Sequence, residues 1–491
     1  MNSLLPKILL GVTLWVGCGK GVGSGPDGGS AARTATWAKT VGPAPIASFF
    51  AGTASDSSGD VYAAGDLWGG GTLDLGNGVA VTGADGGREG VLVKYDTSGL
   101  ALWEQTPGSD DLSSVAVDSA GDVYAAGSRS GAIVLAKYDS SGALKWTQTA
   151  SSSPGLSHFF SLAVDSAGDV YAAGSIGDAG AYDFGNNVIA TSTATPLGAF
   201  DPASNVVLVK YSSSGSAQWA QTVTAGSGAS SFGAVAVDSA DDVYAAGTIA
   251  GEQTYDFGNG VTALSHHIGG PIAGQEAGSV VLVKYSSAGL AQWAQTAVGG
   301  ASSWAAVATD SSGDVYAAGA IGEGTHDFGN AVTAAGTCEA TCGPSLAGPQ
   351  YLVLVKYSSS GVALWAQTVK SGGPNSNLNA LTIDSSGNVF AVGALYGVGK
   401  YDFGNGVTAA VNAASTNYAV LIDFSSSGVA QWADSSSGSG DTTFASVAVD
   451  AKGNLYAAGG IAGSVDFGNG VTGAGANPGV GDGWSALLVR Y

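Results

Sequence analysis

The sequence is poor in charge, in basic residues and in long apolar runs. Only 11% of its 491 residues are charged, and 16 Lys and Arg stand against 38 Asp and Glu, a formal net charge of −22. This acidic balance argues against nucleic acid or an anionic membrane surface as a partner, because both require basic patches. Outside the extreme N-terminus no segment is a transmembrane candidate or shows a sustained 3.6-residue period, so we expect an all-β protein.

Strings that would identify an enzyme are also missing. The chain contains no Gly-x-Ser-x-Gly, no His-Glu-x-x-His and no Walker A string. Asp-Phe-Gly occurs at Asp183 and four further positions, but no other kinase element accompanies it, so we interpret it as part of a repeat. The histidines share no spacing, and we expect each to be a loop or surface residue rather than a catalytic base: His158, His266, His267 and His326.

The chain consists instead of one unit repeated seven times. Each copy has an apolar run ending in Asp, a tight turn, a Val-Tyr-Ala-Ala-Gly element or a close variant, and a later Val-Leu-Val-Lys-Tyr element. The Val-Tyr-Ala-Ala-Gly elements begin at Val61, Val123, Val170, Val243, Val315, Val389 and Leu455. A unit of this size cannot bury its own apolar faces and must stack on its neighbours.

The hydrophobic pattern predicts four short strands per copy. In the fourth copy they are Ala234–Val237, Val243–Ala246, Val280–Tyr285 and Ala291–Thr296, called strands a, b, c and d below. The a–b and c–d turns place Gly where a short hairpin requires positive φ, as at Gly121 and Gly215. In the fourth copy Asp241 takes that position, which Asp tolerates better than most residues.

Four antiparallel strands repeated radially describe a β-propeller, and counting Trp tests its closure. Strand d carries Trp in six copies, but the last copy ends after strand c, at Tyr491. The segment Ala35–Thr40, with Trp37, matches strand d and can supply the missing strand from the other end of the chain. We therefore expect a seven-bladed β-propeller of four-stranded antiparallel blades, its ring closed by an N-terminal strand that leaves no open edge.

The repeat resembles a known family. The string Ala-Val-Asp-x-x-Gly-Asn/Asp-Val-Tyr-x-x-Gly, followed by Val-x-Lys-Tyr-x-x-x-Gly-x-x-x-Trp, resembles the bacterial β-propeller repeat (SBBP) family, common in extracytoplasmic lipoproteins. The resemblance covers about residues 34–491 and implies a propeller without implying an activity. Two copies depart from it: the second lacks the Asp-Phe-Gly-Asn-Gly insertion, and the sixth has Asp423-Phe424 where Lys-Tyr is expected.

The N-terminus predicts secretion. Lys7 precedes an apolar run, Ile8 to Val16, that suits a secretory signal and ends in a lipobox-like Trp-Val-Gly-Cys at Cys18. We expect a signal at 1–18, lipidation of Cys18, a flexible Gly-rich tether at 19–33 and the propeller at 34–491. This places the protein in the bacterial cell envelope, at the outer membrane or cell surface. Ordinary signal cleavage and release as a secreted protein is the alternative.

The other two cysteines, Cys338 and Cys342, lie in one loop. In an oxidising compartment we expect a small disulfide between them, against free or metal-bound thiols. Two Cys without a nearby His make a poor zinc site.

An Asp-Phe-Gly-Asn-Gly element, or a close variant, recurs in six copies. Asn-Gly between apolar residues predicts a tight structural hairpin, whereas calcium held by the Asp and Asn oxygens is the sharper alternative. No other cofactor is expected. The Asp residues of these elements are Asp74, Asp183, Asp256, Asp327, Asp402 and Asp466.

Strand a carries two further repeated positions. The Asp at its end is expected to cap amides of the following turn, with a ring of ligands as the alternative. These residues are Asp56, Asp118, Asp165, Asp238, Asp310, Asp384 and Asp450. The apolar residues six positions earlier could form a ring at the mouth of a central channel, although packing between blades is the competing role. They are Phe50, Leu112, Phe159, Phe232, Trp304, Leu378 and Phe444.

Antiparallel order puts the short a–b and c–d turns at one end of each blade and the long, variable b–c and d–a connections at the other. Variable loops on a rigid scaffold usually carry function. We expect a monomeric, membrane-tethered, non-catalytic scaffold that binds an unidentified protein or glycan through the variable-loop face, and contacts membrane only through its lipid. A propeller polysaccharide lyase or glycosidase and a purely structural envelope protein are the alternatives.

Overall fold

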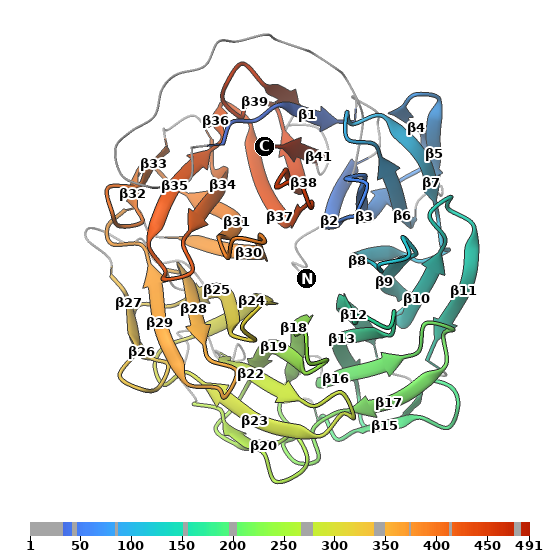
Figure 1. Cartoon of the computed structure of the whole chain (residues 1–491), viewed down its shortest axis with the longest axis vertical. Helices are drawn as coiled ribbons and strands as arrows, with labels where there is room; N and C mark the ends of the chain where they lie inside the picture. Colours follow the sequence, from blue (N-terminus) through green and yellow to red (C-terminus); the bar gives the residue numbers. More distant parts are fainter. Residues whose placement is uncertain are drawn as a thin grey trace. The chain divides into compact units, whose positions relative to one another are not determined.

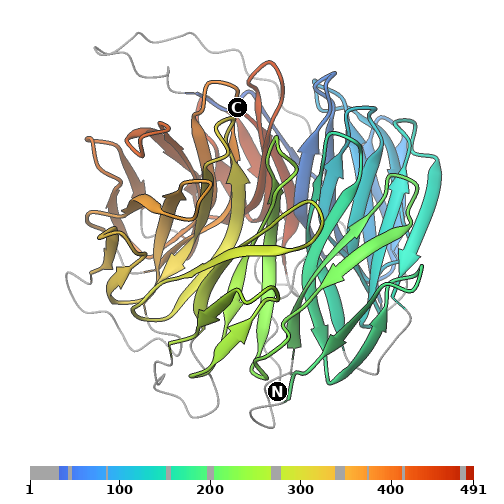
Figure 2. The same ribbon diagram turned by 60° about the horizontal axis from the view of Figure 1, so that its bottom comes forward.

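The structure is a computed structural model that describes residues 33–41, 47–83, 87–150, 156–195, 204–266, 278–337, 349–372, 375–411, 415–475 and 483–491. Within these ranges the chain forms strands and no helix (Figures 1 and 2), which confirms the all-β prediction. No helix capable of crossing a membrane therefore occurs in this part of the chain. Cys18, the predicted signal and all of the predicted tether except residue 33, together with Cys338 and Cys342, lie outside the described residues.

The strands form seven four-stranded sheets, numbered here along the chain. Sheet 1 contains β2 Ala47–Ser55, β3 Val61–Trp68, β6 Arg88–Tyr95 and β7 Ala101–Gln105. Sheet 2 contains β8 Asp111–Val117, β9 Val123–Arg129, β10 Ala132–Tyr138 and β11 Leu144–Thr149. Sheet 3 contains β12 Ser157–Val164, β13 Val170–Gly177, β16 Ser204–Tyr211 and β17 Ala217–Gln221. Sheet 4 contains β18 Ser230–Val237, β19 Val243–Ile249, β22 Ser279–Tyr285 and β23 Ala291–Thr296.

The remaining sheets follow the same order. Sheet 5 contains β24 Ser302–Thr309, β25 Val315–Ile321, β28 Tyr351–Tyr357 and β29 Ala363–Thr368. Sheet 6 contains β30 Ser376–Ile383, β31 Val389–Tyr396, β34 Asn417–Phe424 and β35 Ala430–Ser435. Sheet 7 contains β37 Asp441–Val449, β38 Leu455–Ala462, β41 Ser485–Arg490 and β1 Trp37–Thr40. Strands a, b, c and d of each copy thus lie side by side as predicted.

The two ends of the chain share sheet 7. β1 pairs antiparallel with β41, with Trp37 opposite Arg490 and Thr40 opposite Leu487, and Figure 1 shows the two strands together. The predicted pairing of the Trp37 segment with the final strand is therefore confirmed. It gives the last sheet the strand d that its own copy lacks.

Six small hairpins stand between strands b and c, one in every sheet except sheet 2, as the missing insertion there predicts. They are β4 Gly71–Gly76 with β5 Val79–Gly83, β14 Gly180–Asp183 with β15 Ile189–Ser192, β20 Thr254–Asp256 with β21 Thr262–Leu264, β26 Gly324–Asp327 with β27 Thr333–Gly336, β32 Gly399–Asp402 with β33 Thr408–Val411, and β39 Ser464–Asp466 with β40 Thr472–Ala474. The short β36 Ser437–Gly438 also pairs with β39.

Each hairpin is held by its own Asp and Asn. Oδ1 of every one of the six Asp residues accepts a hydrogen bond from the Gly amide two positions on, at 2.8–2.9 Å. The Asn at the tip has positive φ, and its side-chain amide donates to a carbonyl at the start of strand d, as from Asn77 to Ala101 at 2.9 Å. The equivalent bond of Asn469 reaches Ala35, just before β1. A structural hairpin thus explains why the motif contains both Asp and Asn.

The calcium alternative for these Asp residues stays a prediction. One oxygen of each carboxylate is committed to the turn, and the described residues contain no group of three or more His, Cys, Asp or Glu that could hold a metal ion. The hairpins also correct the prediction that the whole b–c connection lies at the end of the sheet opposite the short turns. The hairpin tip reaches the beginning of strand d, which follows the short c–d turn.

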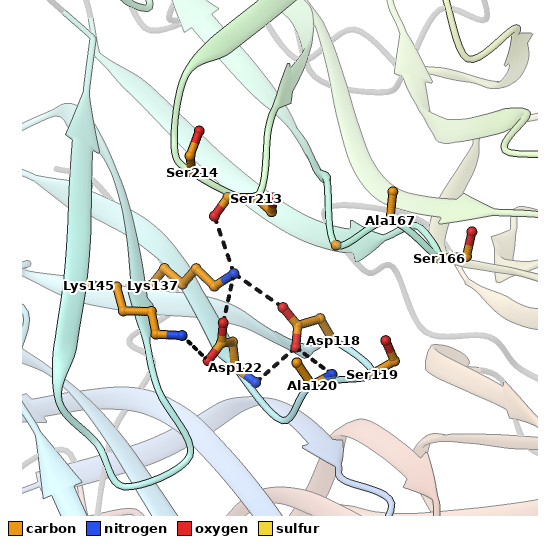
Figure 3. A pocket seen from close by; sticks show the side chains of 11 residues that line it. Asp118, Ser119, Ala120, Asp122, Lys137, Lys145, Ser166, Ala167, Ser213 and Ser214 are labelled. Carbon is orange, nitrogen blue, oxygen red and sulfur yellow. Dashed lines mark hydrogen bonds and ion pairs between the residues drawn. The ribbon is translucent and has the colours of Figure 1, made fainter.

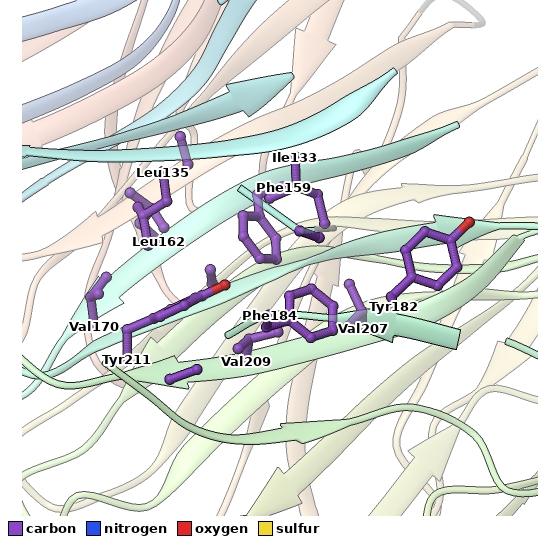
Figure 4. Close-up of a cluster of buried hydrophobic side chains, with 14 of the residues drawn as sticks. Ile133, Leu135, Phe159, Leu162, Val170, Tyr182, Phe184, Val207, Val209 and Tyr211 are labelled. Atoms are coloured by element: carbon purple, nitrogen blue, oxygen red, sulfur yellow. The ribbon is translucent and has the colours of Figure 1, made fainter. Parts of the chain in front are cut away.

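By contacts the chain divides into two compact units. Unit 1 comprises Met1–Val115, Lys370–Gly373 and Asn379–Tyr491, and unit 2 comprises Ala116–Val369 and Pro374–Leu378. In unit 1 one core lies between sheets 1 and 7 and another between sheets 6 and 7. In unit 2 the cores lie between sheets 2 and 3 and between sheets 3 and 4, the first of which Figure 4 shows around Phe159, Phe184 and Tyr211. Neighbouring sheets therefore cover each other's apolar faces.

The seven residues considered for a channel mouth are buried, and four of them belong to these cores: Phe50, Phe159, Phe232 and Phe444. Phe50, Leu112, Phe159, Phe232, Trp304, Leu378 and Phe444 are between 0 and 3% exposed. Phe159, Phe232, Trp304 and Phe444 each stack on the Phe of the hairpin in their own sheet, with ring centroids 5.9–6.4 Å apart. A side chain without water contact does not line an open channel, so the structure favours packing over the channel-mouth role.

Trp37 should contribute strongly to stability because it holds β1 in place. Its ring packs 6.1 Å from that of Tyr456, and its indole N–H donates to Thr97 at 3.4 Å. Trp37→Ala should lower the free energy of unfolding in urea by about 2–3 kcal/mol, less than a fully buried Trp would, because the ring is half-buried. Leu102→Ala, at an exposed position of strand d in sheet 1, is the control. Equal effects would contradict a structural role for β1.

Candidate functional site

The Asp that ends strand a organises the short-turn end of each sheet. In sheet 2, Oδ1 of Asp118 accepts the backbone amides of Ala120 and Asp122 at 3.0 and 2.9 Å. The same two bonds recur at the other six positions, at 2.8–3.1 Å. The predicted capping role of these Asp residues is confirmed.

The second carboxylate oxygen joins a cluster that the sequence analysis missed. In sheets 1 to 5, Oδ2 lies 3.0–3.2 Å from the hydroxyl of the strand-b Tyr. The strand-c Lys lies 3.0–4.0 Å from the same oxygen and 2.8–3.1 Å from a second Asp in the turn. These lysines are Lys94, Lys137, Lys210, Lys284 and Lys356.

Figure 3 shows the cluster of sheet 2, beside a cavity of about 350 Å³ in unit 2. Lys137 is only 4% exposed and contacts both Asp118 and Asp122, and it also donates to the carbonyl of Ser213 in the next sheet. Burial favours the neutral form of Asp122, but hydrogen bonds from Lys145 and Lys137 outweigh it, so the pKa of Asp122 lies below its usual range. The cluster joins strands a, b and c to a neighbouring sheet.

The Tyr of each cluster is neutral and covered by Trp. Burial raises the pKa of Tyr62, Tyr171 and Tyr244 to about 12. The strand-d Trp packs against this Tyr, at ring distances of 5.8–5.9 Å in sheets 1 to 5. Because the constellation recurs in five sheets with every polar group engaged inside it, we interpret it as framework rather than as a reactive site.

Sheets 6 and 7 depart from this pattern. In sheet 6, Phe390 and the buried Asp423 stand where Tyr and Lys are found elsewhere, and Asp384 accepts a bond from Asn388 at 2.9 Å. The guanidinium of Arg33 lies 4.9 Å from the centre of the Phe390 ring, and Lys Nζ lies 4.6–5.0 Å above the Tyr rings of sheets 1 to 5. Arg33, from the N-terminal segment, therefore supplies the cation that sheet 6 lacks.

A second cluster, which does not repeat, lies at the other end of sheet 1, where strand b ends and strand c begins. We call Asp66, Trp68, Arg88 and Asp111 the Asp66 site. Trp68 is opposite Arg88 in the β3–β6 register, and Asp66 is opposite Gly90, so Asp66, Trp68 and Arg88 share one face of sheet 1, while Asp111 begins β8 of sheet 2. This is the end of the sheet that carries the variable connections.

The contacts of the Asp66 site centre on one buried carboxylate. Asp66 is fully buried, and its Oδ2 accepts the Trp68 indole N–H at 2.7 Å and Arg88 Nε at 3.0 Å, with a further bond from Arg88 Nη2. Arg88 also lies 3.7 Å from Asp111, and its guanidinium stacks 4.4 Å above the Trp68 ring. Asp66 thereby fixes the orientation of two side chains that remain accessible.

The electrostatics of Asp66 are unusual. Burial raises its pKa to about 6, and the Arg88 guanidinium only partly offsets that cost. Oδ1 of Asp66 is buried and accepts no hydrogen bond within the described residues. The hydroxyl of Ser109 is likewise buried and unpaired there, and it occupies the place a side chain at Gly90 would take, on the same face as Asp66. Buried polar groups left in this state are rare and often mark function.

The surface that the Asp66 site presents suits recognition. Arg88 is 31% exposed and Trp68 is half-buried. The guanidinium, with its several N–H donors, therefore stacks on an indole ring that is fixed by its hydrogen bond to Asp66. Such a pair can donate to oxygen atoms of a ligand and offer an apolar ring edge. Asp66 itself, being fully buried, positions these groups and does not contact a ligand.

Sequence reasoning missed Asp66, although a signal was present. The residue after Val-Tyr-Ala-Ala-Gly is small or a hydroxyl residue in the other six copies: Ser128, Ser175, Thr248, Ala320, Ala394 and Gly460. A single Asp at a position that is otherwise small, in a chain with few Arg, marks a departure from the repeat. Searching for departures from the repeat would have found it.

The structure also places two aromatic residues near the start of strand c and one of the four histidines. Trp484 is half-buried and packs with Phe49 against Gly460, while Tyr418 is buried. The prediction of a loop or surface position is wrong for His326, which is fully buried in β26 with Nε2 3.2 Å from the carbonyl oxygen of Gly322. Burial lowers its pKa, so the ring is neutral. It stands where Tyr182, Tyr255 and Tyr401 bond the end of strand b in other sheets.

The seven four-stranded sheets with one strand order define a β-propeller-like architecture. No family model and no curated protein matches the chain, so the resemblance to the SBBP family stays a prediction. Among solved structures the chain is similar to one titled "Structure of Dos1 propeller", with 9% sequence identity and a TM-score of 0.38 over 90% of this chain and 92% of that one.

Lys137 and Lys145 offer a matched test of the repeated cluster. Lys137→Met leaves the poorly hydrated Asp118 carboxylate without its cation and removes one of the two cations of Asp122, and it should lower the free energy of unfolding by about 2–4 kcal/mol. Lys145 contacts the same Asp122 but is 42% exposed, so Lys145→Met should cost less than about 1 kcal/mol. Urea unfolding of both variants measures the two losses in the free energy of unfolding. A loss for Lys137→Met no larger than for Lys145→Met would contradict the framework role.

Asp66 should make stability depend on pH. Its pKa is about 6 when folded and near 3.8 when unfolded, so the folded state binds the extra proton between these values and stability falls as pH rises through them. Relative to Asp66→Asn, the wild type should lose on the order of 2 kcal/mol between pH 4 and pH 7. Urea unfolding of both proteins at several pH values measures this. A pH-independent difference would show that the carboxyl titrates normally.

Proposed function

We propose that the chain is a seven-bladed β-propeller that acts as a binding scaffold and recognises a protein or glycan through its variable-loop face. The seven sheets are its blades, and β1 closes the ring by completing the last one. The pairing of β1 with β41 supports closure, because it ties the two ends of the repeat array into one sheet. The cores between neighbouring sheets within each unit support the stacking.

The observation that carries the binding role is the contrast between the two ends of sheet 1. At the short-turn end, Asp56, Tyr62 and Lys94 satisfy one another and repeat in other sheets. At the variable end, Trp68 and Arg88 are unique to this copy, partly exposed and held by a buried Asp. An accessible pair of this kind, rigidly supported, is what a recognition site requires.

The scaffold is proposed to be exported and anchored in the bacterial cell envelope, at the outer membrane or cell surface, by a lipid on Cys18. The apolar run before Cys18 and the Gly-rich stretch after it support this. The protein would act as a monomer and meet membrane only through that anchor. Release as a secreted protein is the alternative, and it leaves the binding role unchanged.

The runner-up is a propeller lyase or glycosidase, and the third possibility is a purely structural envelope protein. In favour of an enzyme, Asp66 and Asp111 both contact Arg88, so two carboxylates do converge. Against it, Asp66 is fully buried and could not reach a glycosidic bond. The accessible groups of the site are those of a binding surface.

A binding screen tests the proposal. The purified chain should bind at least one member of a panel of envelope glycans and envelope proteins. Trp68→Ala and Arg88→Ala should each weaken that binding about tenfold or more, because both remove an accessible, pre-oriented group. Arg129→Ala removes the same charge from an exposed strand end in sheet 2 and should change affinity less than about twofold.

Two results would count against the scaffold. Binding that is indifferent to both Trp68→Ala and Arg88→Ala would place recognition elsewhere. Release of reducing or unsaturated ends from any polysaccharide, abolished by the same variants, would favour the enzyme.

A further inference from the structure

The N-terminal segment enters the fold at the short-turn end of sheets 6 and 7. Arg33 donates to the carbonyl of Gly453, in the a–b turn of sheet 7, and lies over Phe390 at the start of strand b in sheet 6. Trp37 then pairs with Arg490, the last residue of strand c. The first described residue of the N-terminal segment therefore lies at this end of the sheets.

The attachment of Arg33 is specific. It takes the position that a Lys from the same sheet occupies in sheets 1 to 5, beside a cavity of about 450 Å³ lined by Asp384, Asp450 and Lys452. Asp384 and Asp450 lack the Lys partner of the other copies and accept bonds from Asn388 and Asn454 instead. Arg33, four residues before β1, thus lines a pocket together with Asp384, Asp450 and Lys452.

The variable end of unit 1 points the opposite way. Sheets 1 and 7 are aligned, because Tyr456 donates to Gly59 and Lys452 to Ser58, so their a–b turns lie together. Trp68 ends strand b of sheet 1, seven residues after that strand begins at Val61, which is on the order of 25 Å along the sheet. Arg33 and the Asp66 site are therefore at opposite ends of the same pair of sheets.

We propose that the short-turn end faces the lipid bilayer to which the chain is anchored, and that the Asp66 site faces away from it. This rests on the proposed lipidation of Cys18. Fourteen residues lie between Cys18 and Arg33, and a Gly-rich stretch of that length spans on the order of 20 Å. A tether about as long as the sheets themselves, leaving from one end, keeps that end nearer the membrane.

Exposed apolar side chains at the same end support contact with lipid headgroups. The residue after the c–d turn Gly is Leu100 in sheet 1 and Val429 in sheet 6, both in unit 1 and both 41% exposed. Apolar residues recurring at one turn position fit an interfacial surface, while the net charge of −22 makes that contact depend on the anchor.

A pair of fluorescent labels on sheet 6 tests the orientation. Ser427→Cys places a label at its c–d turn, and Val398→Cys, a residue 64% exposed, places one beyond the end of its strand b. Both variants are made in the full-length, lipidated chain with Cys338 and Cys342 replaced by Ser. Each is reconstituted in phosphatidylethanolamine–phosphatidylglycerol vesicles that carry a headgroup-linked quencher. We expect quenching at position 427 to exceed that at position 398 at least threefold.

The proposed acylation of Cys18 and the proposed orientation are tested by separate measurements. Mass spectrometry of the N-terminal peptide first reads the acylation of Cys18. If acyl mass is absent, the proposed anchoring fails, and a His tag that replaces residues 1–18 is then bound to a nickel-chelating lipid so that orientation is still measured. With either attachment, equal quenching or stronger quenching at position 398 would overturn the proposed orientation.

Discussion

The structure depends on one constraint: a four-stranded sheet with two apolar faces cannot be stable alone. Strands b and c of each sheet are buried along almost their whole length, and the cores of both units lie between sheets rather than within them. Each sheet must therefore be covered by a neighbour. The last sheet meets this need with a strand from the other end of the chain, and Arg33 and Trp37 fasten that strand to sheets 6, 7 and 1.

Polar bonds give the stacked sheets a fixed register. The Asp at the end of strand a is the centre of this arrangement, because it caps its own turn with one oxygen and receives Tyr and Lys with the other. Lys137 extends the contact to Ser213 of the next sheet, and Trp146 donates to the same carbonyl. A buried charge is tolerated because three partners share it, and the requirement for all of them explains why the motif repeats as a set.

Sequence reasoning succeeded where contacts are local. Turns, hairpins and capping Asp residues follow from Gly, Asn and Asp at fixed offsets, and the Trp count located β1 because a missing strand leaves an odd copy. It failed where contacts cross strands or copies. Lys137 is 19 residues from Asp118 and 76 from Ser213, so no spacing rule links them. His326 looked like a loop residue because nothing local shows that it replaces a buried Tyr. Asp66 was visible only as a departure from the repeat.

A crosslink between β1 and β41 tests the central claim most directly. Ala38 and Val489 are register partners, so a chain carrying Ala38→Cys and Val489→Cys, with Cys338 and Cys342 replaced by Ser, should form a disulfide between positions 38 and 489 on mild oxidation. The account predicts that this bond forms within the monomer and appears as a linked peptide pair in mass spectrometry. Its absence, or its formation only between two copies, would contradict the claim that one chain joins its own ends in a single sheet.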